Sequence, residues 1–228
     1  MTKNQKAVPK PPAKSAKRKP LVIMVSSTVY GIEDLLDQVY AILSNIGYEV
    51  WMSHKGTVQI WPIGKTAFDN CLEAVEKCDL FLSIITTQYG SGKEDPKSLS
   101  ITHQELLKAI ELNKPRWIIA HDHVPFTKSL LENLGHDTKE KRASLVLKKN
   151  RLIDDLRVID MYEAATRHDI NVYRDREGNW VQKYVFPKDV FLFATAQFNR
   201  YEEIEKFLAE QFTDKAAVAK VAEKKVTS

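Results

Sequence analysis

Short runs of consecutive apolar residues alternate, along the first half of the chain, with longer segments in which apolar residues recur every three or four positions. Leu21 to Val25, Asp79 to Thr86 and Arg116 to His121 are runs of the first kind, too short for helices and rich in Val, Ile and Leu. Such runs are typical of strands buried on both faces of a parallel sheet. Tyr48 to Met52 is predicted to be a further short strand.

The segments between these runs have helical spacing. Residues 31–46 place Ile, Leu and Val on one stripe and stop at Gly47, a residue that suits the left-handed position after a helix. Residues 66–77 and 100–114 repeat this pattern, and Pro115 ends the third helix. Because strands and helices alternate, we predict an α/β fold with a mainly parallel sheet covered on both faces.

The second half of the chain has a different pattern. Helices are predicted over residues 139–156, 162–168 and 188–212, with a short apolar piece at 158–160. A β-hairpin is predicted from two short segments, Asn171 to Tyr173 and Trp180 to Tyr184, which flank DREGN with Gly178 at the turn. We therefore divide the chain into a basic arm, an α/β domain, a mostly helical extension with a hairpin packed on the sheet, and a flexible tail: residues 1–20, 21–125, 126–212 and 213–228.

Charge is unevenly distributed. Residues 1–20 hold seven of the 34 basic residues and none of the 30 acidic ones, interleaved with prolines, which favours a disordered arm. The arm is either a solubilising extension or a contact with nucleic acid or an acidic partner. No stretch approaches the roughly 20 apolar residues of a membrane span, and the basic N-terminus lacks the apolar run of a signal peptide, so we expect a cytoplasmic protein without a membrane partner.

The cysteines and histidines favour structural roles. Cys71 and Cys78 lie seven residues apart in a predicted helix and are interpreted as reduced core thiols. His121 and His123 follow a strand, but alternate residues of an extended chain point to opposite sides and no further ligands complete a set. We therefore expect neither a metal site nor a bound cofactor.

The start of the third predicted helix contains the sharpest chemical signal, Glu105. A carboxylate at this edge of the sheet would hold ribose hydroxyls or stabilise an oxocarbenium ion while an N-glycosidic bond breaks. Ser100 and Thr102, just before it, are candidates for nucleotide binding. The structural alternative is a capping box, because Thr102 and Glu105 have the Thr-x-x-Glu spacing in which each caps the other's backbone.

Other candidates lie at neighbouring strand ends. Ser26, Ser27 and Thr28 follow the first strand and would either cradle a phosphate or ribose or cap the next helix. Tyr89 would place its ring against a base and Gly90 would let the backbone approach a ligand; alternatively they are a packed aromatic and a turn glycine. Because these strand ends lie side by side in a parallel sheet, one pocket would bring the candidates together.

Three segments, MVSSTVYGIEDLLDQV, EKCDLFLSIITTQYGSG and LSITHQELLKAIELNKPRWIIAHD, together resemble the domain-of-unknown-function family numbered 4062 over about Leu21 to Val124. That family is similar to TIR domains and nucleoside deoxyribosyltransferases. The resemblance implies a flavodoxin-like three-layer sandwich with a nucleotide or NAD-like ligand at the strand ends. It also implies that Glu105 is the carboxylate that attacks or stabilises the ribosyl carbon. Members often occur in bacterial antiphage defence or signalling.

The sequence departs from this family at one place. Val29, Tyr30 and Gly31 intervene before the first helix, where members commonly have Phe-Asp-Leu. The resemblance leaves two function classes open. One is an enzyme that cleaves an N-glycosidic bond of NAD, a nucleoside or a nucleotide. The other is a non-catalytic module that senses a nucleotide or assembles with itself as a homo-oligomer. Asp69 is a further acidic candidate, with a solvated helix face as its alternative.

Overall fold

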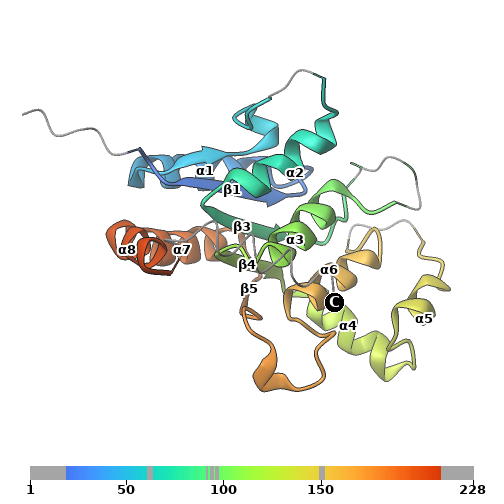
Figure 1. The fold of residues 1–228 in the computed structure, drawn as a ribbon. Helices are drawn as coiled ribbons and strands as arrows, with labels where there is room; N and C mark the ends of the chain where they lie inside the picture. The colour runs from blue at the N-terminus through green and yellow to red at the C-terminus, as the bar shows by residue number, and fades with distance from the viewer. Residues whose placement is uncertain are drawn as a thin grey trace, which may run out of the picture.

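The computed structural model describes residues 19–60, 64–90, 92, 95, 98–148 and 152–211. Most of the basic arm predicted over residues 1–20, and the tail predicted over 213–228, therefore lie outside the described residues. The described chain contains a five-stranded sheet with strand order β2-β1-β3-β4-β5, in which every neighbouring pair is parallel. Helices cover both faces (Figure 1), so the predicted flavodoxin-like sandwich is confirmed.

The first half folds as the apolar pattern predicts. Its strands and helices alternate in the order β1 (Val22–Ser27), α1 (Glu33–Ile46), β2 (Glu49–Trp51), a 3₁₀ turn (Ser53–Lys55), α2 (Ala67–Lys77), β3 (Leu80–Ile85), α3 (Ile101–Glu111) and β4 (Arg116–His121). Gly47 caps α1 with a φ of 119°, as a residue without a Cβ can. All six residues of β3 are buried, as expected for a central parallel strand.

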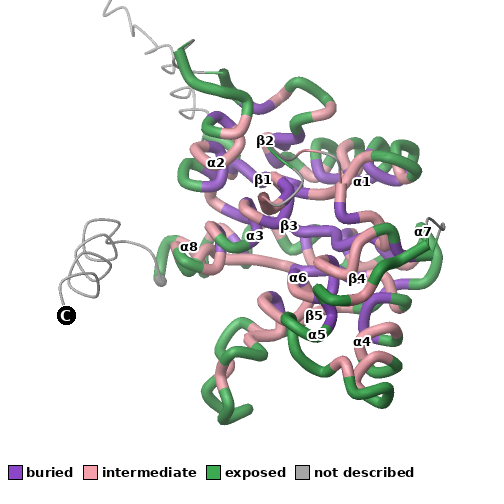
Figure 2. Tube along the Cα trace, turned by 90° about the vertical axis from the view of Figure 1, so that its right-hand side faces the viewer, coloured by how far each residue is buried: buried purple, intermediate pink, exposed green. Residues whose placement is uncertain are grey.

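The second half adds helices on both faces and one strand. Its elements are α4 (His123–Asn133), α5 (Lys139–Ala143), α6 (Arg157–Ala165), a 3₁₀ turn (Tyr173–Asp175), β5 (Val181–Tyr184), α7 (Pro187–Phe198) and α8 (Tyr201–Gln211). The face covered by α2, α3, α4 and α6 has a core separate from that under α1, α7 and α8. Figure 2 shows the strands as the buried centre between these layers.

The predicted hairpin is wrong. Val181–Tyr184 pairs in parallel with Ile118–His121 and is the fifth strand of the sheet. The proposed first arm of the hairpin leads instead into the 3₁₀ turn, and the Gly178 carbonyl accepts a hydrogen bond from the Arg116 guanidinium, with 3.3 Å between the two atoms. The segment between β4 and β5 contains α4, α5 and α6, and so provides the long crossover that parallel pairing requires.

Three predictions for the second half need correction. The helix predicted over 139–156 is confined to α5, because the residues after it lack a buried stripe; Val146 is 94% exposed. Val158 to Asp160 is no separate piece but the buried start of α6. The C-terminal helix breaks after Phe198, and α8 then turns so that the Tyr201 hydroxyl accepts a hydrogen bond from Leu21 N at 2.9 Å.

Candidate functional site

The end of β1 points one hydroxyl into the core and two toward backbone. Ser26 Oγ donates a hydrogen bond to Glu105 Oε2 at 2.5 Å. Ser27 Oγ donates to the Ile84 carbonyl and Thr28 Oγ1 to the Gln88 carbonyl, each at 2.9 Å. The helix-capping alternative for these hydroxyls is wrong, because α1 begins only at Glu33 and has no side-chain cap. The phosphate or ribose cradle stays a prediction.

Glu105 lies in the second turn of α3, on the side that faces the sheet. Its exposed fraction is only 4%. The capping box predicted for Thr102 and Glu105 is wrong, because Ser100 is the N-cap and its hydroxyl accepts from the His103 amide at 3.4 Å. Thr102 is a buried residue of the first turn. The position of Glu105 is therefore explained by its contact across to β1 and not by local helix chemistry.

The Glu105 carboxyl is surrounded by uncharged partners. Besides Ser26, the Cys71 thiol of α2 forms a hydrogen bond with it. Burial raises the pKa of Glu105 to about 7, although both hydrogen bonds oppose the rise. Burial and the neighbouring Glu105 raise the pKa of the Cys71 thiol to about 12, so the thiol is the donor of this pair. No lysine or arginine in the described ranges pairs with Glu105.

Ser83 adds a second hydroxyl on this face of the sheet. It is the register partner of Ser26 across the β1–β3 pair, so the two side chains point the same way. Ser83 is fully buried, and its Oγ has no hydrogen-bond partner among the residues that the structure describes. Buried polar atoms are normally paired, so an orphan hydroxyl beside the Ser26–Glu105 contact is unusual.

Tyr89 lies inside the core. Its exposed fraction is zero, and its hydroxyl bonds His103 Nδ1 at 2.8 Å while accepting from Ser100 N at 3.2 Å. Burial, with smaller effects of nearby cations, lowers the pKa of His103 to about 4, so this imidazole is neutral at pH 7. The Arg157 guanidinium lies 4.6 Å from the centre of the Tyr89 ring. This is the packed aromatic of the structural alternative.

Gly90 has a φ of 91°, a conformation that favours glycine. A Cβ at this position would lie 3.1 Å from Thr28 Oγ1, so the turn after β3 fits closely against the end of β1. The backbone of Gly90, which was predicted to lie close to a ligand, lies close to Thr28 in this structure. Together with Tyr89, it fixes the loop that leads to α3.

The structure brings Ser26 to Glu105, Tyr89 to Ser100 and Gly90 to Thr28, but among the predicted candidates only Ser26 bonds the Glu105 carboxyl. Sequence reasoning missed Cys71 and Ser83 as neighbours of the carboxyl; the one available signal was a serine inside the otherwise apolar run LFLSII. It also missed Asp154 and Arg157, which bond Tyr89 N at 2.7 Å and the Ser98 carbonyl at 2.9 Å, and so tie the second half of the chain to the loop before α3.

The other polar candidates have structural partners. Asp69 is exposed and forms the capping box of α2 with Thr66. His121 Nδ1 accepts a hydrogen bond from the His123 backbone. In the part of the chain that the structure describes, one group of side chains has metal-ligand spacing: Glu132, Glu163 and His168. Lys128 and Arg142 already pair with these carboxylates, which disfavours a cation there.

Neither of two surface hollows in the described part of the chain is lined by Glu105 or its partners. One of about 760 Å³ separates the end of α1 from the α7–α8 junction, and one of about 320 Å³ lies beside the start of β5. Among the described residues, Cys71 is the partly exposed neighbour of the carboxyl. Any route from the surface to Glu105 that follows its known contacts therefore passes Cys71.

Comparison with known proteins adds the family. The sequence profile described as "Domain of unknown function (DUF4062)" matches residues 22–177, which is more than half of the chain. No curated protein matches the chain. None of the helices in the described ranges is long and apolar enough to cross a membrane. The matched residues include β1, α2, β3 and α3, the elements that carry Ser26, Cys71, Ser83 and Glu105. The chain thus belongs to the DUF4062 family.

Proposed function

We propose that this protein binds NAD or a related nucleotide and cleaves its N-glycosidic bond with Glu105. The observation that carries the proposal is a fully buried carboxyl whose pKa is raised to about 7 and whose hydrogen-bond partners are all uncharged. Perturbed acids of this kind cluster at functional sites, because burying an acid without a cation costs folding energy. The resemblance to TIR domains supports a nucleotide as the ligand.

The chemistry follows from the two protonation states of Glu105. As the C1–N bond of the substrate lengthens, both bonding electrons leave with the base and positive charge develops on the ribosyl carbon. The carboxylate form stabilises that charge, and water then adds to the carbon and loses a proton. A cationic nicotinamide leaves as a neutral molecule, whereas a neutral base needs a proton, which the acid form supplies.

Ser26 holds the carboxyl in place for this chemistry. Its hydroxyl approaches Glu105 from a central strand, and strands are more rigid supports than loops. Because Glu105 is 4% exposed, we expect a substrate to reach it after a described neighbour, such as Cys71 with the adjoining turn of α2, moves aside. Activity is therefore expected to depend on a condition that opens this layer, such as self-assembly.

The decisive experiment measures release of free base from NAD, nucleosides and nucleotides by chromatography, at low and high protein concentration. Glu105→Gln should lower release at least about 100-fold, the usual contribution of a general acid or base. The matched control is Glu111→Gln on the same helix, whose side chain is 70% exposed and which should retain full activity. Release that survives in folded Glu105→Gln would refute the assignment.

The second candidate is a non-catalytic nucleotide-binding or assembly module. It is favoured by the burial of Glu105 and by the distance between this residue and the surface hollows. Nucleotide-dependent stabilisation against heat, without base release from the assembled protein, would support this module and exclude the enzyme.

A further inference from the structure

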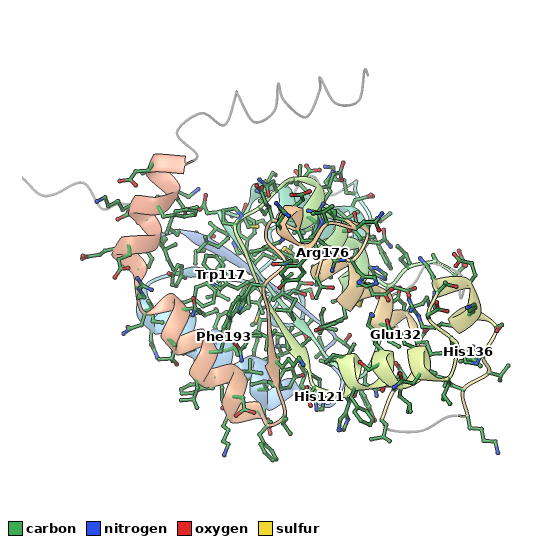
Figure 3. All side chains as sticks on the ribbon, turned by 90° about the horizontal axis from the view of Figure 1, so that it is seen from below. Trp117, His121, Glu132, His136, Arg176 and Phe193 are labelled. Carbon is green, nitrogen blue, oxygen red and sulfur yellow. The ribbon has the colours of Figure 1, made fainter. Side chains whose placement is uncertain are left out.

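A hollow with aromatic walls lies at the start of β5, far from Glu105. It measures about 320 Å³ and is lined by Tyr162, Thr166, Tyr173, Arg176, Asn179, Trp180 and Val181. In Figure 3, Arg176 and His121 mark opposite ends of β4, and the hollow lies at the Arg176 end. Tyr173 and Trp180 are 75% and 74% exposed, unusual values for such large rings.

Contacts of Arg176 and Gly178 hold the loop that carries these rings in place. Arg176 Nε donates to the Ile170 carbonyl at 2.6 Å, and its guanidinium lies 5.7 Å from the centre of the Tyr173 ring. Gly178 sits against Arg116, where an added Cβ would lie 2.4 Å from Nη2. These contacts hold the walls without covering them, so the surface is pre-shaped for a partner.

The chemistry of the hollow fits a proline-rich segment. Such segments adopt the polyproline II conformation without internal hydrogen bonds, and they bind between exposed aromatic rings that also offer a donor to their carbonyls. The Trp180 indole N–H has no partner among the described residues and is a donor of this kind. The Asn179 amide, also in the wall, is another.

The chain itself contains a matching segment. Residues 9–14 read PKPPAK, and they precede β1 by only a few residues. β1 and β5 both begin at the same edge of the all-parallel sheet and are separated by three strand spacings, about 15 Å. The eight steps along the chain from Pro12 to Pro20 would span about 25 Å in the polyproline II conformation, which is long enough to reach the hollow.

Residues 171–180 contain two acidic and two basic residues, and Arg176, which lines the hollow, is itself a cation. Asp175 and Glu177 are exposed in the loop that carries the rings, and neither carboxylate has an ion-pair partner in the described ranges. Lys10 and Lys14 flank the three prolines of PKPPAK. We propose that residues 9–14 bind in the hollow between Tyr173 and Trp180 of the same chain, which gives the basic arm a docking site independent of Glu105.

The test uses the full chain labelled with 5-fluorotryptophan, and Trp180→Phe identifies the Trp180 signal by ¹⁹F NMR. Replacing Pro9, Pro11 and Pro12 together by Ala should shift this signal, while the signals of Trp51 and Trp117 in the sheet stay in place. An unchanged Trp180 signal would overturn the proposal. A signal that depends on protein concentration would overturn docking within one chain and assign the segment to a second copy.

A peptide of residues 7–20 provides the second measurement. Added to the triple-alanine variant, it should return the Trp180 signal to its position in the unmodified protein. For fluorescence-anisotropy titration of the labelled peptide, Trp180→Ala in the triple-alanine background should weaken binding at least about tenfold, as loss of a tryptophan anchor does. Tyr30→Ala, which removes a ring that is 80% exposed near the opposite end of β1, is the matched control. Equal affinities for the two variants would contradict the assignment.

Discussion

Two groups of acids, one half-buried and one buried, lie on the same face of the sheet and are stabilised in opposite ways. Around α6, the Arg142 guanidinium donates to Asp160 at 2.8 Å and to Glu163 at 2.5 Å. These hydrogen bonds raise the pKa of Arg142 against the effect of its burial. Under α3, Glu105 has a hydroxyl and a thiol for partners. One group is held together by paired charges and the other by neutral donors.

This difference in hydrogen-bond partners indicates that the Arg142 group has a structural role and the Glu105 group a chemical one. A carboxylate that holds a buried guanidinium in place contributes to the fold through a charge-assisted hydrogen bond. Ionisation of a buried carboxyl that has only neutral donors destabilises the folded protein. Because its pKa lies near neutral, such a group can give and take a proton at physiological pH. We interpret the Arg142 group as a brace for α5 and α6, and the Glu105 group as the reactive position.

The largest expected effect is on the brace. Arg142→Met should lower the free energy of unfolding by about 3 kcal/mol, because it leaves Asp160 and Glu163 without their buried partner. Urea denaturation at pH 7 measures this loss. The neighbouring Lys141→Met, at a side chain that is 53% exposed, should change stability by less than about 0.5 kcal/mol. Similar losses of unfolding free energy in both variants would contradict the structural role assigned to Arg142.

The second prediction concerns pH. Glu105 has a pKa of about 7 when folded and an ordinary value of 4.5, so the folded state binds the proton more tightly. Its stabilising contribution is complete below pH 4.5 and is lost as the pH rises through 7. Relative to Glu105→Gln, the unmodified protein should lose about 2–3 kcal/mol of unfolding free energy between pH 5 and 8. Urea titrations at both pH values measure this; parallel curves would contradict it.

The third prediction concerns the effect of Ser26 on the ionisation of Glu105. Ser26→Ala removes a donor that favours the ionised form of Glu105, so the midpoint of the pH-dependent loss should move up by roughly one unit. Ser83→Ala is the matched control in the paired position of β3. It removes a hydroxyl without a partner in the described residues, and should leave the midpoint in place and stability unchanged or slightly higher.

The smallest effect is expected at Arg157, which contacts the loop before α3. Its guanidinium stacks on Tyr89 and donates to the Ser98 carbonyl, a combination that a lysine cannot reproduce. Arg157→Lys should cost about 1 kcal/mol by thermal unfolding, well below the loss at Arg142. If the two losses are equal, the second half of the chain braces the loop before α3 as firmly as it braces α6.

The sequence is sufficient to predict the layers of the fold and the candidate carboxylate. Runs such as the five residues Leu21 to Val25 favour strands, because they are too short for a helix and rich in Val and Ile. The alternation of strands with amphipathic helices then determines the parallel arrangement. Glu105 was identified from its position at a strand-to-helix junction, which is a property of the topology and not of its neighbours.

The contacts of Glu105 were beyond sequence reasoning. Its partner Ser26 is 79 residues away, and local spacing favoured a capping box. The same Thr-x-x-acid spacing is a capping box at Thr66 and Asp69 but not at Thr102, because Ser100 takes the cap two residues earlier. β5 was missed for a related reason: whether Val181 to Tyr184 pairs locally or with β4 depends on the free edge of a strand 60 residues before it.

The late position of β5, α7 and α8 also determines the order in which the chain can fold. The Tyr48 hydroxyl bonds the carbonyl of Phe198, and Leu21 bonds Tyr201, across separations of 150 and 180 residues. Contacts between residues so far apart in sequence slow folding, because the entropy of closing the long loop is lost before the contacts can stabilise the chain. During synthesis on the ribosome, the apolar side of β1 and α1 that packs against α7 stays exposed for almost the entire remaining synthesis, until α7 emerges. We therefore expect chaperones to bind this surface of the nascent chain.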